Sequence, residues 1–246
     1  MLLDSKVAII YGAAGPVGSA VARAYAREGA VVHLAGRTSS TLDEVAKGIR
    51  QDGGAAYVGP VDVLDRAALE EHAASVIDTS GTIDICFNAT SNDDIQGTTL
   101  VDLPLAEFLQ PVTKAVTAHF NIGTTVGRHM IRQGGGVILV MAGGREAIPR
   151  LGGAHVAWTA LAGLSRQFAA DLGPHGVRVN WLLSPGSPGS DPMSDGLEPA
   201  PDTEGLVPHH MPSYDEVGNV AVFAASDWAR TMTATEINFT GGAVVD

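Results

Sequence analysis

Cysteine, basic residues and long apolar runs are all scarce in this 246-residue chain. Cys86 is the only cysteine, so no internal disulfide or cysteine cluster can form, which favours a reducing cytoplasm. The longest uninterrupted apolar stretch covers residues 137–142, far too short to cross a bilayer. The first strand-like run begins too early to leave room for a signal sequence before it. We therefore expect a cytoplasmic protein with no membrane partner.

Positive charge is outnumbered, with 15 Lys and Arg residues against 27 Asp and Glu and a formal net charge of −12. Such a charge repels polyanions, so we expect no nucleic-acid partner. A metal site is conceivable at Asp191, His209 and His210, but no spaced set of further ligands accompanies them. No metal site is therefore predicted.

Strand-length apolar runs alternate with helical patterns from end to end. The runs cover residues 7–11, 31–35, 55–58, 83–87, 137–141, 177–183 and 235–239. The helical segment at 105–132 is expected to bend or restart near Pro111. Strands separated by helix-length segments predict an α/β fold, a doubly wound parallel sheet of about seven strands with helices on both faces. We expect a single domain over residues 1–246, in which the Pro-, Gly- and Ser-rich stretch 184–212 is an irregular loop on the substrate side.

A glycine-rich loop separates the first strand from the first helix. Gly12 allows a tight turn, Gly15 allows close backbone approach, and Gly18 lets the helix lie close to the sheet. The N–H groups at the start of that helix would face a pyrophosphate. This context predicts a Rossmann-type dinucleotide site with Gly12, Gly15, Val17 and Gly18 as binding residues. A tight turn without a ligand is the alternative.

The ends of the next strands offer the remaining contacts for such a cofactor. Gly36 leaves space and Arg37 offers a guanidinium where an NAD-preferring fold usually has a carboxylate, so NADP(H) is favoured and NAD(H) stays possible. Asp62 and Val63 are placed to receive the adenine, and Asn88 to contact the adenosine ribose. For Asp62, a loop or helix-capping carboxylate is the alternative.

These residues carry a resemblance to the short-chain dehydrogenase/reductase family that extends over almost the whole chain. Residues 61–65, 163–166, 171–180, 184–186, 224–227 and 241–246 are similar to further segments of that family. The resemblance implies an oxidoreductase that uses a nicotinamide cofactor on a small-molecule substrate. It also implies that Pro185 and Gly186 line the nicotinamide side, and that the chain forms a homodimer or homotetramer through its long helices.

The catalytic residues of the family do not carry over with the scaffold. Counting back from Gly163, the family's Tyr falls on Ala154 and its Lys on Trp158. Its Ser falls near the end of the fifth strand, where residues 140–144 have no hydroxyl, and its helix Asn falls near Ala115. None of the three lysines, Lys6, Lys47 and Lys114, has a tyrosine four residues before it.

Substitute acid–base groups are sparse. His155 is next to the vacated Tyr position, and Arg145 and Glu146 follow the fifth strand, but each also has a structural interpretation as a packing or loop residue. The sequence therefore predicts an atypical NADP(H)-dependent oxidoreductase that transfers hydride without the tyrosine–lysine relay. Two alternatives remain: a non-redox cyclase, isomerase or lyase that reuses the crevice, and a catalytically silent cofactor-binding homologue.

Overall fold

The computed structural model describes residues 1–145, 148–183 and 212–242. Its single sheet contains β1 (Val7–Tyr11), β2 (Val31–Gly36), β3 (Ala55–Pro60), β4 (Ile85–Asn88), β5 (Gly136–Ala142), β6 (Val177–Leu183) and β7 (Glu236–Asn238). The helices are α1 (Pro16–Arg27), α2 (Ser39–Gln51), α3 (Arg66–Ser80), α4 (Leu105–Gln133), α5 (Ala154–Leu172) and α6 (Tyr214–Ala225). Two short 3₁₀ turns, η1 (Gly173–His175) and η2 (Asp227–Ala229), follow α5 and α6.

All seven strands are parallel, in the order β3-β2-β1-β4-β5-β6-β7. Helices cover both faces of the sheet, and in the central strand β1 every residue is therefore buried. This confirms the predicted doubly wound α/β fold. The order reverses between β1 and β4, which pair with Tyr11 opposite Asn88. A reversal of this kind opens a crevice at the carboxyl edge of the sheet, where ligands of such folds bind.

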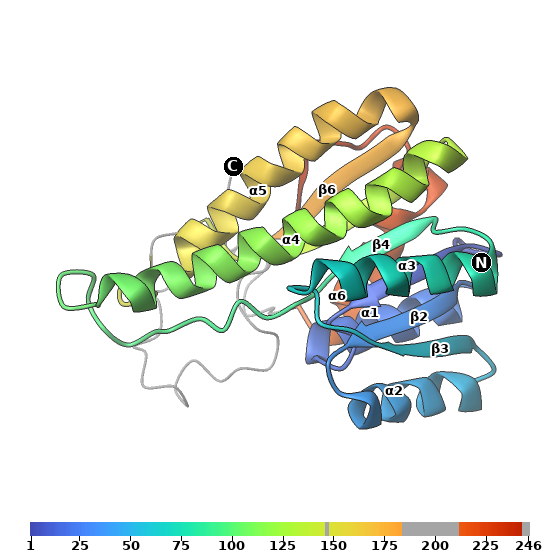
Figure 1. The fold of residues 1–246 in the computed structure, drawn as a ribbon, viewed down its shortest axis with the longest axis horizontal. Helices are drawn as coiled ribbons and strands as arrows, with labels where there is room; N and C mark the ends of the chain where they lie inside the picture. The colour runs from blue at the N-terminus through green and yellow to red at the C-terminus, as the bar shows by residue number, and fades with distance from the viewer. Residues whose placement is uncertain (146–147, 184–211, 243–246) are drawn as a thin grey trace.

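The helices form one layer on each face of the sheet (Figure 1). On one face α1, α2 and α6 enclose a core with side chains such as Ile10 and Leu34. On the other, α3, α4 and α5 pack over Ile9 and Cys86. Among the described residues, no helix is both long enough and apolar enough to span a membrane.

Local signals set several helix ends. Pro16 begins α1, where its missing N–H costs no hydrogen bond. The Asp65 carboxylate caps α3 by accepting from the Ala68 N–H at 3.1 Å. Gly134 ends α4 with a φ of +84°, which glycine adopts without strain.

Pro111 does not interrupt the long helix, so the restart that the sequence suggested near Pro111 does not occur. The structure has one continuous α4 from Leu105 to Gln133 with Pro111 buried inside it. A proline removes one N–H donor, but the other hydrogen bonds of the helix remain. Pro111 also lies against the segment before α5, since a Cβ at Gly153 would be 3.0 Å from its Cγ. Tertiary packing therefore keeps the helix whole where local preference favours a break.

Candidate cofactor site and active site

The four strand ends named by the sequence meet at the carboxyl edge of the sheet. The Gly12 N–H donates to the Ala35 carbonyl at the end of β2 at 2.9 Å. The Ala89 N–H, just after β4, donates to the carbonyl of Tyr11 at 2.9 Å. The Val61 N–H donates to the carbonyl of Gly36 at 2.8 Å. These bonds bring the glycine loop, Arg37, the Asp62 segment and Asn88 to one edge.

The glycine loop has the geometry of a cradle at the start of α1. Gly12 has a φ of +80°, and a Cβ there would overlap the Ala89 carbonyl. A Cβ at Gly18 would overlap the Gly12 carbonyl, so glycine lets α1 approach the loop. At Gly15, the residue before α1, a Cβ would meet only the Gly12 carbonyl at 3.4 Å. The helix N-terminus is therefore open at Gly15, which fits a pyrophosphate. Val17 is half-buried and packs on the adjoining core.

Arg37 extends from the end of β2 into solvent and makes no hydrogen bond or ion pair with another described residue. The nearby Asp93 carboxylate forms an ion pair with Lys114 of α4. The hydrogen bond from Lys114 is the main reason why the pKa of Asp93 is lowered, and the charge of Arg37 contributes. Lys114 thus holds this carboxylate and leaves the guanidinium donors of Arg37 available.

Asp62 and Val63 lie beside the same edge. The Asp62 carboxylate accepts from the Leu64 N–H at 3.0 Å, which is a loop-capping contact, but the side chain is exposed. The Val63 carbonyl accepts from Asn121 of α4 at 3.1 Å. This bond fixes the segment that follows β3.

The Asn88 side chain belongs to a buried network and not to the open surface. Its Oδ1 accepts from the N–H of Thr90 at 3.0 Å and from the Thr90 hydroxyl at 2.7 Å. Its Nδ2 is 3.5 Å from Nδ1 of His119, whose Nε2 is 3.1 Å from the Ser165 hydroxyl. An amide nitrogen can only donate, so these partners assign the neutral His119 tautomer with the proton on Nε2. Full burial lowers the pKa of His119 to about 4, so it stays neutral near pH 7.

At the end of β5, the structure brings Gly143 and Trp158 together. A Cβ added at Gly143 would overlap the indole ring of Trp158, which projects from the first turns of α5. Ala154 begins α5 and is fully buried. Around this point the strand end is therefore covered by an indole ring.

The candidate substitute acids are engaged in structural contacts. Nε2 of His155 donates to the Arg145 carbonyl at 2.7 Å and ties α5 to the loop after β5. The Arg145 guanidinium forms an ion pair with Glu236 of β7 at 2.7 Å. Glu146, Pro185 and Gly186 lie outside the described residues, as do Asp191, His209 and His210. No cluster of three metal-ligating side chains occurs within the described ranges.

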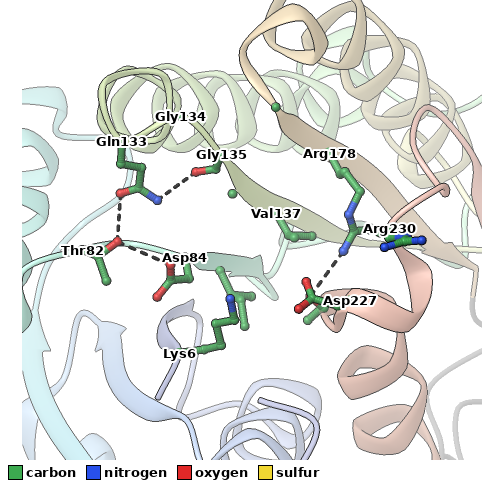
Figure 2. A pocket seen from close by; sticks show the side chains of 14 residues that line it. Lys6, Thr82, Asp84, Gln133, Gly134, Gly135, Val137, Arg178, Asp227 and Arg230 are labelled. Carbon is green, nitrogen blue, oxygen red and sulfur yellow. Dashed lines mark hydrogen bonds between the residues drawn. The ribbon is translucent and has the colours of Figure 1, made fainter. Parts of the chain in front are cut away.

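A larger groove, of about 390 Å³, opens at the opposite, amino edge of the sheet (Figure 2). Its polar side chains mainly hold loops together. Gln133 donates to the carbonyls of Ile83 and Gly135, both at 2.8 Å, and Asp84 accepts from the Val7 N–H at 2.8 Å. Arg178 donates to three carbonyls at the end of α6 and beyond η2. This groove is separated from the crevice by the length of the strands.

Two features of the site escaped the sequence. The Lys114–Asp93 ion pair joins α4 to the loop after β4, and the His119 network joins β4, α4 and α5. A polar residue among apolar ones at helical spacing is the only signal for His119, and it does not identify partners. The sequence around Lys114 gives no sign of its pairing with Asp93.

Comparison with known proteins places this architecture in a family. Residues 12–244 match the family model described as enoyl-(acyl carrier protein) reductase. D-threitol dehydrogenase of Mycolicibacterium smegmatis is 31% identical, with 98% of this chain and 93% of that protein covered. An NAD⁺-bound xylitol dehydrogenase superposes with a TM-score of 0.87 at 25% identity, covering 98% of this chain and 100% of the other. A short-chain dehydrogenase/reductase from Burkholderia xenovorans gives 0.88 at 29% identity, covering 99% of each chain. The chain belongs to the short-chain dehydrogenase/reductase family of oxidoreductases.

Proposed function

We propose that this protein binds NADP(H) at the glycine loop and transfers hydride to or from a small apolar or conjugated substrate, without a tyrosine–lysine proton relay. The observation that carries the proposal is the indole of Trp158 packed over Gly143 at the end of β5. Trp158 occupies the position expected for the family's Lys, and Gly143 lies close to the position expected for its Ser. Ala154 stands at the Tyr position.

The cofactor half of the proposal rests on the open N-terminus of α1 and on Arg37. Gly15 leaves space at the helix N-terminus, where backbone N–H groups favour a phosphate. A 2′-phosphate near the end of β2 would meet the guanidinium of Arg37, while the Asp93 carboxylate nearby is neutralised by Lys114. NAD(H) is the alternative cofactor, as in the NAD⁺-bound xylitol dehydrogenase.

The substrate half follows from proton chemistry. When bound, the nicotinamide supplies or takes up a hydride. Hydride delivery to a ketone leaves an alkoxide that needs a proton, and Ala154, Trp158 and Gly143 carry no acid to provide it. Losing general acid–base assistance costs ~10²–10⁴-fold in rate. Hydride delivery to the β-carbon of an alkene conjugated to a carbonyl moves the electron pair of the double bond into a delocalised enolate instead, which can take its proton from water. Positioning by the apolar wall of Trp158 would then supply most of the rate.

The first test is titration of the purified protein with NADPH and NADH, followed by nicotinamide fluorescence. We expect saturable binding with tighter NADPH, and loss of binding in Gly15→Glu because the added carboxylate fills and repels the pyrophosphate position. Gly173→Glu is the matched control, since Gly173 has helical dihedral angles after α5 and nothing lies within 4 Å of an added Cβ. Arg37→Ala should weaken NADPH by at least about tenfold and NADH far less.

The second test is turnover with NADPH over matched saturated ketones and conjugated enones. We expect enones to react and ketones to be slower by roughly two orders of magnitude or more. Equal rates on both would refute the substrate half. Failure to bind either nucleotide would refute the cofactor half. Binding without turnover would favour a silent homologue, and turnover without added nucleotide a non-redox enzyme.

A further inference from the structure

A small cavity of about 190 Å³ lies between α5 and the last two strands, at the carboxyl edge of the sheet. Its lining includes Gly143, Trp158, Arg145, Arg166, Trp181 and Glu236. It is distinct from the glycine loop and from the groove at the amino edge (Figure 2).

Glu236 is the anchor of one wall. Its side chain is only 11% exposed. One carboxylate oxygen, Oε2, accepts from the indole N–H of Trp181 at 2.9 Å. The other, Oε1, forms the ion pair with Arg145 at 2.7 Å. This carboxylate is therefore neutralised and held in place, and it orients both partners.

Arg166 of α5 is oriented in a different way. Its guanidinium carbon lies 4.6 Å from the centre of the Trp181 ring, in a cation–π contact. Yet the Arg166 side chain makes no hydrogen bond or ion pair with any described residue. A stacked guanidinium keeps its five N–H donors in one plane, which matches the geometry of a carboxylate.

The charges and walls of the cavity define a ligand class. Among the described lining residues two guanidiniums accompany one carboxylate, and the indole of Trp158 adds a flat apolar surface. The volume is below that of pockets for drug-sized ligands, so the occupant is small. We infer that this α5–β7 cavity binds the carboxylate of a small planar molecule, with Arg166 as the main contact. The cavity shares Gly143 and Trp158 with the proposed hydride-transfer site, whereas the inference rests on Arg166, Trp181 and Glu236.

Benzoate is the test probe, with benzamide as its neutral isostere. Titrations are followed by calorimetry and by quenching of tryptophan fluorescence, at fixed ionic strength. We expect saturable benzoate binding and benzamide at least about tenfold weaker, because charge-assisted hydrogen bonds are lost. Arg166→Gln should weaken benzoate by at least about tenfold.

Arg230→Gln is the matched control, because it removes the same charge from an exposed arginine at the amino-edge groove. It should leave benzoate affinity unchanged. Arg166→Lys keeps the charge without the planar fork and should bind benzoate with intermediate affinity. Circular dichroism verifies that each variant is folded.

Three results would overturn the inference: no saturable benzoate binding, equal affinity for benzamide, or equal loss in Arg166→Gln and Arg230→Gln. If the Arg166 variants do not fold, the comparison of benzoate with benzamide on the unaltered protein still tests whether the cavity binds a carboxylate.

Discussion

His119 is the residue on which the interior of the candidate site depends most. It is fully buried and lies between the Asn88 amide and the Ser165 hydroxyl, with its ring against Phe168 in an edge-to-face contact. Burial lowers its pKa to about 4, because the surroundings disfavour the charged form. In the unfolded chain the pKa of a histidine is about 6.5. Between these two pKa values, His119 is therefore neutral in the folded protein and protonated in the unfolded chain.

This difference predicts a loss of stability in acid. Above pH 6.5 both states are neutral, so the contribution of His119 is fully present. As the pH falls from about 6.5 towards 4, only the unfolded chain gains a proton, and that contribution is lost. Between pH 7 and pH 5, His119 should account for about 2 kcal/mol of the free energy of unfolding.

Urea unfolding at pH 7 and pH 5 measures that contribution. His119→Gln should lower stability at pH 7 but reduce the acid loss by about 2 kcal/mol relative to the unaltered protein. His33 and His72, whose pKa values are also lowered to about 4 by burial, should keep part of the acid sensitivity in that variant. Thr117→Gln, at an exposed position of the same helix, should leave the loss of stability between pH 7 and pH 5 unchanged. An acid loss in His119→Gln equal to that of the unaltered protein would contradict the assignment.

At the scale of elements, the contact between the end of β5 and the first turns of α5 sets the character of the site. Gly143 and Trp158 fit together because one lacks a side chain and the other has a large one. A serine at Gly143 is therefore incompatible with the indole of Trp158.

We expect this incompatibility to appear as coupling in a double-mutant cycle. Gly143→Ser alone should destabilise the protein by about 1–3 kcal/mol through overpacking. In a Trp158→Ala background the same substitution should cost little, because the space is vacated. Chemical denaturation of the four proteins measures the coupling, and additive effects of the two substitutions would contradict the packing described for this pair.

The helices and strands are the part of the molecule that the sequence predicts best. The strands follow from mainly apolar runs, and residues 177–183 coincide with β6, where apolar side chains surround Arg178 and Asn180. The glycine loop also has a local signature. Helix α4 continues through Pro111 although proline disfavours a helix interior, because the packing of the helix outweighs this local preference.

Contacts between distant side chains had no local signature. The contacts of Trp181 with Arg166 and Glu236 join α5, β6 and β7, and the Lys114–Asp93 pair joins α4 to the loop after β4. The direction of each side chain depends on how elements pack, and sequence spacing does not specify that. The candidate cofactor residues could therefore be placed at one edge from the sequence, whereas the polar networks beside them could not.

At the scale of the whole molecule, the outer surface of α4 and α5 exposes several large apolar side chains. Apolar side chains are exposed there at Leu105, Leu109, Phe120, Ile131 and Val156. In Figure 1 the two helices lie side by side and form one long face. Contiguous exposed apolar surface commonly marks a protein–protein interface. We propose that this face joins two copies of the chain in a homodimer or within a homotetramer.

Light scattering coupled to size-exclusion chromatography tests the interface. Phe120 is 45% exposed, and Phe120→Glu should shift the protein towards the monomer by placing a charge in an apolar contact. Phe223→Glu on α6, where the side chain is 39% exposed, is the control and should not change the mass. A monomeric unaltered protein, or an unchanged mass in Phe120→Glu, would exclude this face as the interface.

We propose that the scaffold retains a dinucleotide site while apolar side chains have replaced the proton relay beside it. A crystal structure of the protein with NADP⁺ tests this most directly. We predict the pyrophosphate at Gly15, the 2′-phosphate at Arg37, and the nicotinamide facing Trp158 with no tyrosine hydroxyl or lysine ammonium within hydrogen-bonding distance of the substrate position. A nucleotide bound elsewhere, or a tyrosine–lysine pair brought to the nicotinamide by a neighbouring subunit, would contradict it.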